Sequence, residues 1–118
     1  MFIKNPEDIQ QLDVSNGDLH PILSILNIGI VITDDKGVIT FYNSVHAEID
    51  GLRPADVIGR KICDFTEVDE NSSLIMRCLR TSRPVIECPV LYKNRNGKIV
   101  DSINSVFPLV KNGKVVGV

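Results

Sequence analysis

The sequence lacks any apolar run long enough to cross a bilayer, which takes about twenty predominantly apolar residues. Its first twelve residues also lack the apolar core of a secretory signal, because Lys4, Glu7 and Asp8 interrupt them. Neither a membrane-spanning helix nor an export signal is predicted. We therefore expect the protein to be cytoplasmic.

Positive charge is also scarce. Lys and Arg together number 13 against 15 Asp and Glu, which gives a net charge of −2. Binding to nucleic acid depends on clustered Lys and Arg. Arg77, Arg80 and Arg83 lie near one another, but on a helix that also carries apolar residues, and they are interpreted as its solvated face. No direct contact with nucleic acid is expected.

Cysteine is limited to Cys63, Cys78 and Cys88, with no C-x-x-C pair. An odd number at wide spacing fits neither a disulfide framework nor a zinc site. All three are expected to be small hydrophobic residues of the core. A redox-sensing role would require a lowered thiol pKa.

Catalytic and metal-binding groups are few as well. His20 and His46 stand far apart in the sequence and make a poor metal site. His46 lies near Glu48 and Asp50, and this spacing could give an acid–base pair, but the preferred interpretation is a solvated helix face. Because no other nucleophile or acid–base pair is held in one place, we predict neither an enzyme nor a metal site.

The 118 residues suit one domain built from short hydrophobic segments. Helical spacing and capping residues predict helices within residues 5–26, 43–49, 54–58 and 71–82. β-Branched runs and Asn-Gly turns predict strands over residues 28–33, 38–42, 85–93, 99–107 and 109–118. Strands grouped at both ends, with helices between them, predict an α+β fold with one five-stranded antiparallel sheet and helices on one face.

Several short motifs occur in a fixed order along the chain. They are Asp35 to Ile39 followed by Asn43, then Gly51, Asp56 to Arg60, Thr81 to Val85, Asn96 to Lys98, and Asn112 to Gly117. In this order, the stretch from about Leu26 to Val118 resembles a PAS domain, with Ser82 where the family usually has Gly. It is most similar to the N-terminal sensory domains of bacterial sigma-54-dependent transcription activators, and then to histidine-kinase input domains.

The resemblance implies a PAS fold for residues 27–118, preceded by a helical segment over residues 1–26 that serves capping or dimerisation. The sequence contains no G-x-x-x-x-G-K-[ST] phosphate loop. We therefore interpret the chain as a sensory module whose output domain, an ATPase-type activator or a kinase, is not part of it.

Two cofactors of PAS subfamilies are not expected. Flavin photoreceptors carry an N-C-R-F-L-Q motif, and residues 61–66 here supply a Cys without its Asn, Arg and Gln companions. Haem sensors ligate iron through a His on the long helix, and residues 71–82 contain none. Neither flavin nor haem is predicted, which leaves an unidentified small molecule as the ligand to consider.

The expected ligand pocket lies between the sheet and the helices, where largely apolar pockets with a few polar anchors form. The candidate lining residues are Ile30, Ile32, Phe41, Cys63, Phe65, Ile75, Cys78, Leu79, Cys88, Val90, Ser102 and Asn104. Ser102 and Asn104 share one strand face and need partners if that face looks inward. A ligand, the backbone or water could supply them; alternatively, Ile99, Ile103 and Phe107 face inward instead.

Both faces of the last strands carry apolar residues, so the face without helices also needs a cover. The candidate cover is the N-terminal helix, on its own sheet or on that of a partner, through Leu19, Ile22, Leu23 and Leu26. We predict a homodimer, and a sensory module that regulates an attached output domain in transcription activation. The alternative is a dimerisation scaffold with a filled core, and the volume of the interior cavity distinguishes the two.

Overall fold

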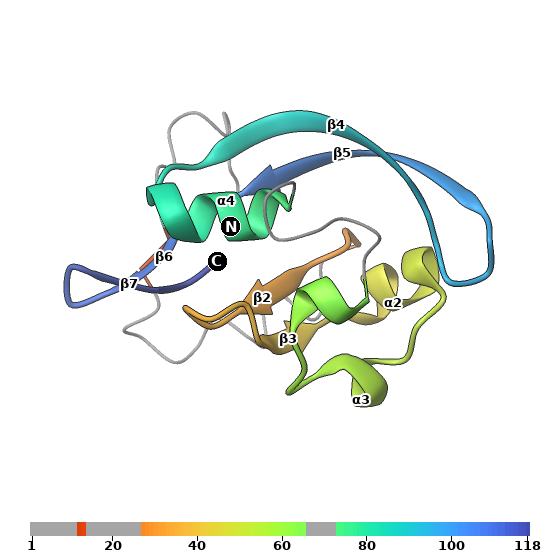
Figure 1. Cartoon of the computed structure of the whole chain (residues 1–118), viewed down its shortest axis with the longest axis horizontal. Coiled ribbons are helices and arrows are strands. Elements are labelled where there is room, and N and C mark those ends of the chain that lie inside the picture. The colour runs from red at the N-terminus through yellow and green to blue at the C-terminus, as the bar shows by residue number, and fades with distance from the viewer. Residues whose placement is uncertain (1–11, 14–26, 66–72) are drawn as a thin grey trace.

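The computed structural model describes residues 12–13, 27–65 and 73–118, and at positions 12 and 13 it describes only the backbone. The strands are β1 (Leu12–Asp13), β2 (Val31–Thr33), β3 (Ile39–Tyr42), β4 (Val85–Lys93), β5 (Ile99–Val106), β6 (Leu109–Lys111) and β7 (Lys114–Gly117). The helices are α2 (Ser44–Asp50), α3 (Pro54–Val57), the 3-10 turn η2 (Ile62–Asp64) and α4 (Leu74–Thr81) (Figure 1). The predicted α+β class is confirmed. Among the described helices, none has the length and apolar character needed to cross a membrane.

The helix that follows the first hairpin has the predicted caps. Asn43 is its N-cap, and the Asn43 side chain accepts a hydrogen bond from the His46 N–H at 3.0 Å. Gly51 ends α2 with a φ of 71°, a left-handed conformation that costs glycine little.

The long helix begins later than predicted. α4 starts at Leu74, with Ser73 as its N-cap in place of Asn71. The reason is local, because the Ser73 hydroxyl accepts the Met76 N–H at 3.3 Å. The C-cap is Ser82, at a φ of 57°.

The strands form three small sheets instead of the continuous five-stranded sheet that was predicted. Antiparallel pairs join β2 to β3, β4 to β5 and β6 to β7. β5 and β6 are consecutive strands, and two residues, Phe107 and Pro108, lie between them. Since proline has no N–H to donate, the ladder is interrupted there.

The backbone of the first hairpin is hydrogen-bonded to the end of the C-terminal strand group at a place that we call the Thr33–Val118 junction. The Thr33 N–H donates to the Val118 carbonyl at 2.9 Å, and the Val118 N–H donates to the Thr33 carbonyl at 3.2 Å. Gly117 permits this approach, because a Cβ at that position would lie 2.0 Å from the Thr33 oxygen. The junction connects the β2–β3 hairpin with β7.

The N-terminal segment departs from its predicted helix at β1. Leu12 and Asp13 pair in parallel with Leu109 and Val110 of β6. The helical prediction is wrong at these two positions, because a β6 strand offers them a backbone partner that apolar spacing does not reveal. The other residues of the predicted helical segment lie outside the described residues, including the dimerisation candidates Leu19, Ile22, Leu23 and Leu26.

A bulge in the first hairpin decides which side chains face the helices. Ile32 pairs with Phe41 and Thr33 with Ile39, so Thr40 is an extra residue in β3. The extra residue shifts the alternation of side chains by one position. Ile39 and Tyr42 therefore point to the helix side, whereas Phe41 points to the other side.

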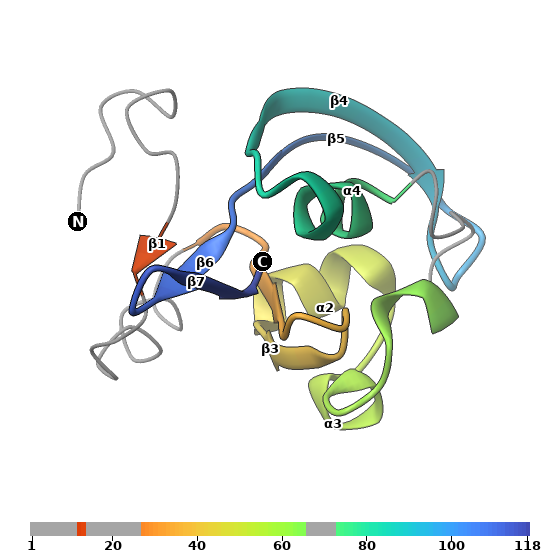
Figure 2. The same ribbon diagram turned by 60° about the vertical axis from the view of Figure 1, so that its left-hand side comes forward.

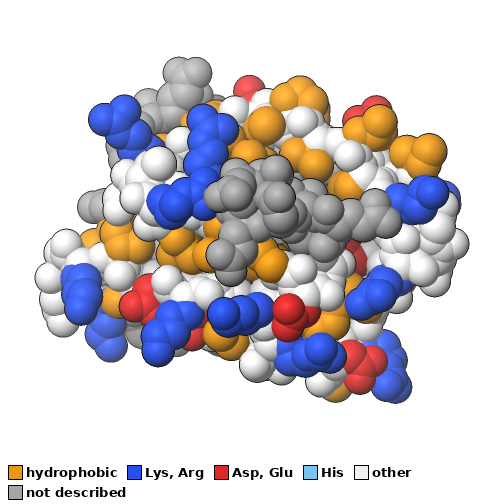
Figure 3. Space-filling view, in the orientation of Figure 1, with side chains coloured by type: hydrophobic (Ala, Val, Ile, Leu, Met, Phe, Trp, Pro, Cys, Tyr) orange, Lys and Arg blue, Asp and Glu red, His pale blue; other side chains and the backbone are white. Residues whose placement is uncertain are grey.

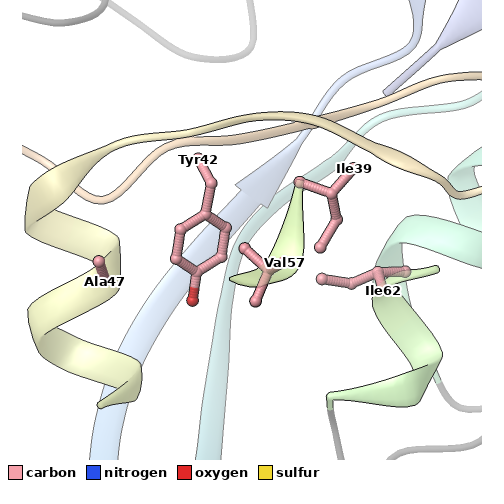
Figure 4. Packing of buried hydrophobic residues seen from close by; sticks show 5 residues of the cluster. All are labelled: Ile39, Tyr42, Ala47, Val57 and Ile62. Atoms are coloured by element: carbon pink, nitrogen blue, oxygen red, sulfur yellow. The ribbon is translucent and has the colours of Figure 1, made fainter. Parts of the chain in front are cut away.

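The side chains on the helix side form the main hydrophobic cluster, which we call the helix-side cluster. It contains Ile39, Tyr42, Ala47, Val57 and Ile62, and Figure 4 shows these side chains converging from β3, α2, α3 and η2. The opposite side of the hairpin forms a smaller cluster around Ile32 and Leu109. The hairpin is thus covered by helices on one side and by β6 and β7 on the other.

The β4–β5 ribbon is long and arches over α4. In Figures 1 and 2, α4 lies between this ribbon on one side and the β2–β3 hairpin with α2 on the other. Exposure alternates along β5, so Val100, Ser102, Asn104 and Val106 lie on the covered face. The outer face carries Leu91, Ile99 and Ile103, which are 71%, 66% and 72% exposed.

Candidate functional site

The predicted pocket residues are divided between three places. Those packed against the helix-side cluster are Cys63, Phe65 and Ile75. Those on the other side of the first hairpin, in the smaller cluster, are Ile30, Ile32 and Phe41. Phe41 lies with Ile32 because the two are cross-strand partners, and the bulge at Thr40 places Ile39 on the opposite, helix side.

The remaining candidates lie on α4 and on the β4–β5 ribbon, where α4 contacts β5. Cys78 of α4 is fully buried, and Leu79 is half-buried. The covered face of the ribbon carries Cys88, Val90, Ser102 and Asn104. Burial raises the pKa of the Cys78 thiol to about 11, so this thiol stays protonated at neutral pH and behaves as a core residue.

Ser102 and Asn104 face inward and have protein partners. The Ser102 hydroxyl donates to the Val90 carbonyl at 3.3 Å, and the Asn104 amide donates to the Ser102 hydroxyl at 3.0 Å. No buried side-chain nitrogen or oxygen in the described part of the chain is without a hydrogen-bond partner. The open question from the sequence is thereby answered, since the ribbon itself satisfies Ser102.

A second polar group lies at the end of α2, and of its members the sequence had indicated only His46 and Asp50. The Tyr42 hydroxyl donates to Asp50 Oδ2 and the Tyr92 hydroxyl to Asp50 Oδ1, each at 2.5 Å. His46 Nε2 lies 2.9 Å from Asp50 Oδ2, and its ring packs edge-on against Tyr42 with centroids 5.0 Å apart. We call these four residues the Asp50 clamp, because they join β3, α2 and β4.

The clamp shifts the protonation of its members. Burial alone raises the pKa of Asp50, but the hydrogen bond and charge of His46, with the two tyrosine hydroxyls, outweigh it and leave the pKa below the ordinary value. Burial and the Asp50 carboxylate raise the pKa of Tyr42 and Tyr92. Asp50 therefore stays ionised and both tyrosines stay protonated at neutral pH.

The solvated helix face predicted for His46 and Asp50 is wrong. Their side chains are only 22% and 18% exposed. The i, i+4 spacing of His46 and Asp50 was visible in the sequence, but Tyr92 is separated from Asp50 by 42 positions. Because periodicity reports only local faces, no sequence signal could have placed Tyr92 there.

The β4–β5 turn is fastened next to the clamp. The Asn94 side chain donates to the Ile49 carbonyl at 2.9 Å, and the Arg95 N–H donates to the Asp50 carbonyl at 3.1 Å. Asn94 Oδ1 also accepts the N–H groups of Asn96 and Lys98, which fixes the turn. The tip of the ribbon is therefore bound to the C-terminal end of α2, where free carbonyls accept hydrogen bonds.

Comparison with known proteins decides the family. Residues 27–118 match the PAS domain family. The chain belongs to the PAS family. No group of three or more His, Cys, Asp or Glu side chains that could hold a metal ion occurs among the residues described.

PAS relatives include a transcription factor and several solved structures. The transcriptional activator RocR of Bacillus subtilis is 25% identical over 97 residues, which cover 81% of this chain and 21% of RocR. A PAS domain from Colwellia psychrerythraea is 16% identical with a TM-score of 0.67, covering 84% of this chain and 86% of that one. The E. coli DhaR(N)–DhaL complex contains a chain 16% identical with a TM-score of 0.64, covering 84% of this PAS chain and 32% of that one. This chain thus spans about a fifth of RocR.

Proposed function

We propose that this PAS domain is a non-enzymatic, cytoplasmic sensory module that regulates an attached transcription-activating domain of the sigma-54-dependent kind. Its membership of the PAS family and its similarity to one fifth of a transcriptional activator support this proposal. A sensor must have two arrangements that a cue stabilises unequally. The element we assign to this change is α4, which lies between the β4–β5 ribbon and the β2–β3 hairpin (Figure 2).

The single observation that carries the sensory role is the mixed character of the surface around α4. Ser102 and Asn104 face inward among apolar neighbours, beside a helix whose Cys78 is fully buried. A small molecule with one or two polar groups that enters here would exchange hydrogen bonds with Ser102, whose present partner is the Val90 carbonyl. Such an exchange would separate α4 from the ribbon and alter the outer surface.

Native mass spectrometry of freshly purified protein tests this role. A bound ligand adds a discrete mass that disappears on denaturation, and Ser102→Ala should reduce the occupied fraction about tenfold because the half-buried hydroxyl that would bind the ligand is lost. Asp101→Ala, an exposed change on the same strand, is the matched control and should leave occupancy unchanged. A protein that never carries added mass, and that no metabolite stabilises against heat, would count against a ligand sensor.

A dimerisation module is the second candidate, and a separate observation favours it. Leu91, Ile99 and Ile103 project from the outer face of the β4–β5 ribbon. Figure 3 shows hydrophobic side chains along the upper edge of the molecule, where this ribbon lies in Figure 1. In the register of the ribbon, Leu91 lies diagonally between Ile99 and Ile103, so the three form one patch. Exposed apolar patches of this kind mark interaction surfaces.

Light scattering after size exclusion tests the dimer. We expect the mass of two chains for the wild type and of one chain for Leu91→Ser/Ile103→Ser, since the substitutions remove the apolar contact. Ile49→Ser, at another exposed isoleucine, is the control and should remain dimeric. A wild-type monomer at high concentration would refute this interface.

A further inference from the structure

Phe65 has two guanidinium groups over its ring. The Arg60 Cζ lies 4.7 Å and the Arg95 Cζ 5.8 Å from the ring centroid. Both distances fall within the roughly 6 Å range of a cation–π contact. Phe65 is half-buried and packs against the helix-side cluster, so the ring is held in place. The ring therefore contacts two positively charged side chains from separate segments of the chain.

The backbone of each arginine is fixed. The Arg60 N–H donates to the Val57 carbonyl at 3.0 Å, and the Arg60 carbonyl accepts the Ile39 N–H at 2.9 Å. Arg95 is in the β4–β5 turn, whose hydrogen bonds to the end of α2 are described above. Two side chains with fixed attachment points lose less conformational freedom when they bind a ligand together.

The charge of this pair is not balanced by an ion pair within residues 27–65 and 73–118. The salt bridges there join His46 to Asp50 and Arg53 to Asp56. Because both guanidinium carbons lie within about 6 Å of one ring centroid, their like charges repel each other, and an anion that contacts both groups would relieve that repulsion. A guanidinium group also presents N–H donors in a planar fork that matches the oxygens of an oxyanion.

We propose that Arg60, Arg95 and Phe65 form a binding site for the phosphoryl group of a small molecule. A phosphate monoester has nearly two negative charges at neutral pH and three acceptor oxygens, which suits two guanidinium groups better than one carboxylate does. The bound group would link the segment around η2 to the β4–β5 turn. The site uses exposed arginines and is independent of the ligand proposed for the surface around α4.

An NMR titration with inorganic phosphate at constant ionic strength tests this site. We expect saturable shifts of the Arg60 and Arg95 Nε–H signals, with a Kd on the order of 1 mM. Arg60→Gln and Arg95→Gln should each weaken binding at least about tenfold. Arg83→Gln removes an exposed charge elsewhere and should bind as the wild type does.

Two further comparisons test the guanidinium geometry and the kind of phosphate that binds. Arg60→Lys and Arg95→Lys keep the charge but lose the fork, so they should show intermediate affinity, and they replace a Gln variant that fails to fold. Tighter binding of glycerol 3-phosphate than of inorganic phosphate identifies a phosphate monoester, and the reverse order identifies the free ion.

Three outcomes would overturn the proposal. The first is an absence of saturable shifts in the wild type. The second is equal weakening by Arg83→Gln, since that would show only a general charge effect. The third is binding that emerges only after Glu67, Asp69 and Glu70, which follow Phe65 in the sequence, are replaced by amides, because the arginines would then serve the chain's own carboxylates.

Discussion

Two of the joints between the N-terminal and C-terminal parts of this PAS domain use different chemistry. The Thr33–Val118 junction is made of backbone groups, with two hydrogen bonds and a glycine that keeps the strands close. The Asp50 clamp is made of side chains that meet on one half-buried carboxylate. One joint depends on the absence of a Cβ, and the other depends on a charge.

This difference has consequences for regulation. The junction is made of backbone N–H and carbonyl groups, which do not titrate, so its two hydrogen bonds do not depend on pH. The clamp is built on the Asp50 carboxylate, and it weakens when acid protonates that carboxylate. The junction fixes where β7 meets the first hairpin, whereas the clamp is the joint that solution conditions can adjust.

The largest expected effect comes from closing the space at the backbone joint. Gly117→Ala places a Cβ 2.0 Å from the Thr33 oxygen, so the strands must separate, at a cost of about 3 kcal/mol of unfolding free energy. Hydrogen exchange should accelerate at the Thr33 and Val118 amides while the clamp remains protected.

Gly113→Ala is the matched control for this change. Its φ of 77° makes alanine unfavourable there by about 1 kcal/mol, but a Cβ would meet no atom within 4 Å. If Gly113→Ala destabilised the domain as much as Gly117→Ala, the close approach at the junction would not be the cause.

The next largest effect comes from removing the shared carboxylate. Asp50→Ala leaves two half-buried tyrosine hydroxyls and His46 without their acceptor, which should cost about 2–3 kcal/mol in denaturant unfolding. Tyr92→Phe removes one of these bonds and should cost about half as much. Asp101→Ala, at an exposed carboxylate of β5, should change stability by less than about 0.5 kcal/mol, and a comparable loss there would contradict the clamp.

Local sequence signals predicted the parts of this fold that depend on one or two neighbouring residues. Asn43 and Gly51 marked the ends of α2, and the Asn-Gly turns marked the ends of the C-terminal strands. These features are determined by the conformations that single residues allow. The start of α4 was missed by a few residues, because both Asn71 and Ser73 are acceptable caps and only one can be used.

Features that depend on distant residues could not be predicted in this way. The bulge at Thr40 put Phe41 and Ile39 on opposite sides of the hairpin, and Phe41 joined Ile30 and Ile32 on the side away from the helices. The clamp required Tyr92 to meet Asp50 across 42 positions. Both are decided by tertiary packing, about which the period of hydrophobic residues says nothing.

The third prediction uses acid to separate the two joints. Because the folded pKa of Asp50 is below its ordinary value of 3.8, the clamp contributes stability above that pH and loses it as pH falls through the folded value. Unfolding free energy should therefore drop less below about pH 4 in Asp50→Asn than in the wild type. Gly117→Ala should keep the wild-type acid dependence, and equal slopes in all three proteins would show that Asp50 is not the group responsible.

The smallest expected effect lies between the joints, at the end of α4. Ser82 caps this helix at a φ of 57°, where a side chain is strained and glycine is not. Ser82→Gly should therefore raise the unfolding free energy by about 0.5–1 kcal/mol, partly offset by the greater freedom of glycine in the unfolded chain. Thr81→Gly, one position earlier and inside the helix, should act in the opposite direction and by more, because it also removes the hydroxyl that donates to the Arg77 carbonyl and accepts the Arg83 N–H. α4 contributes no residue to either joint. Amide hydrogen exchange at Thr33 and in the clamp should therefore change only as much as global stability does. A selective change in exchange at one joint would mean that α4 is coupled to that joint.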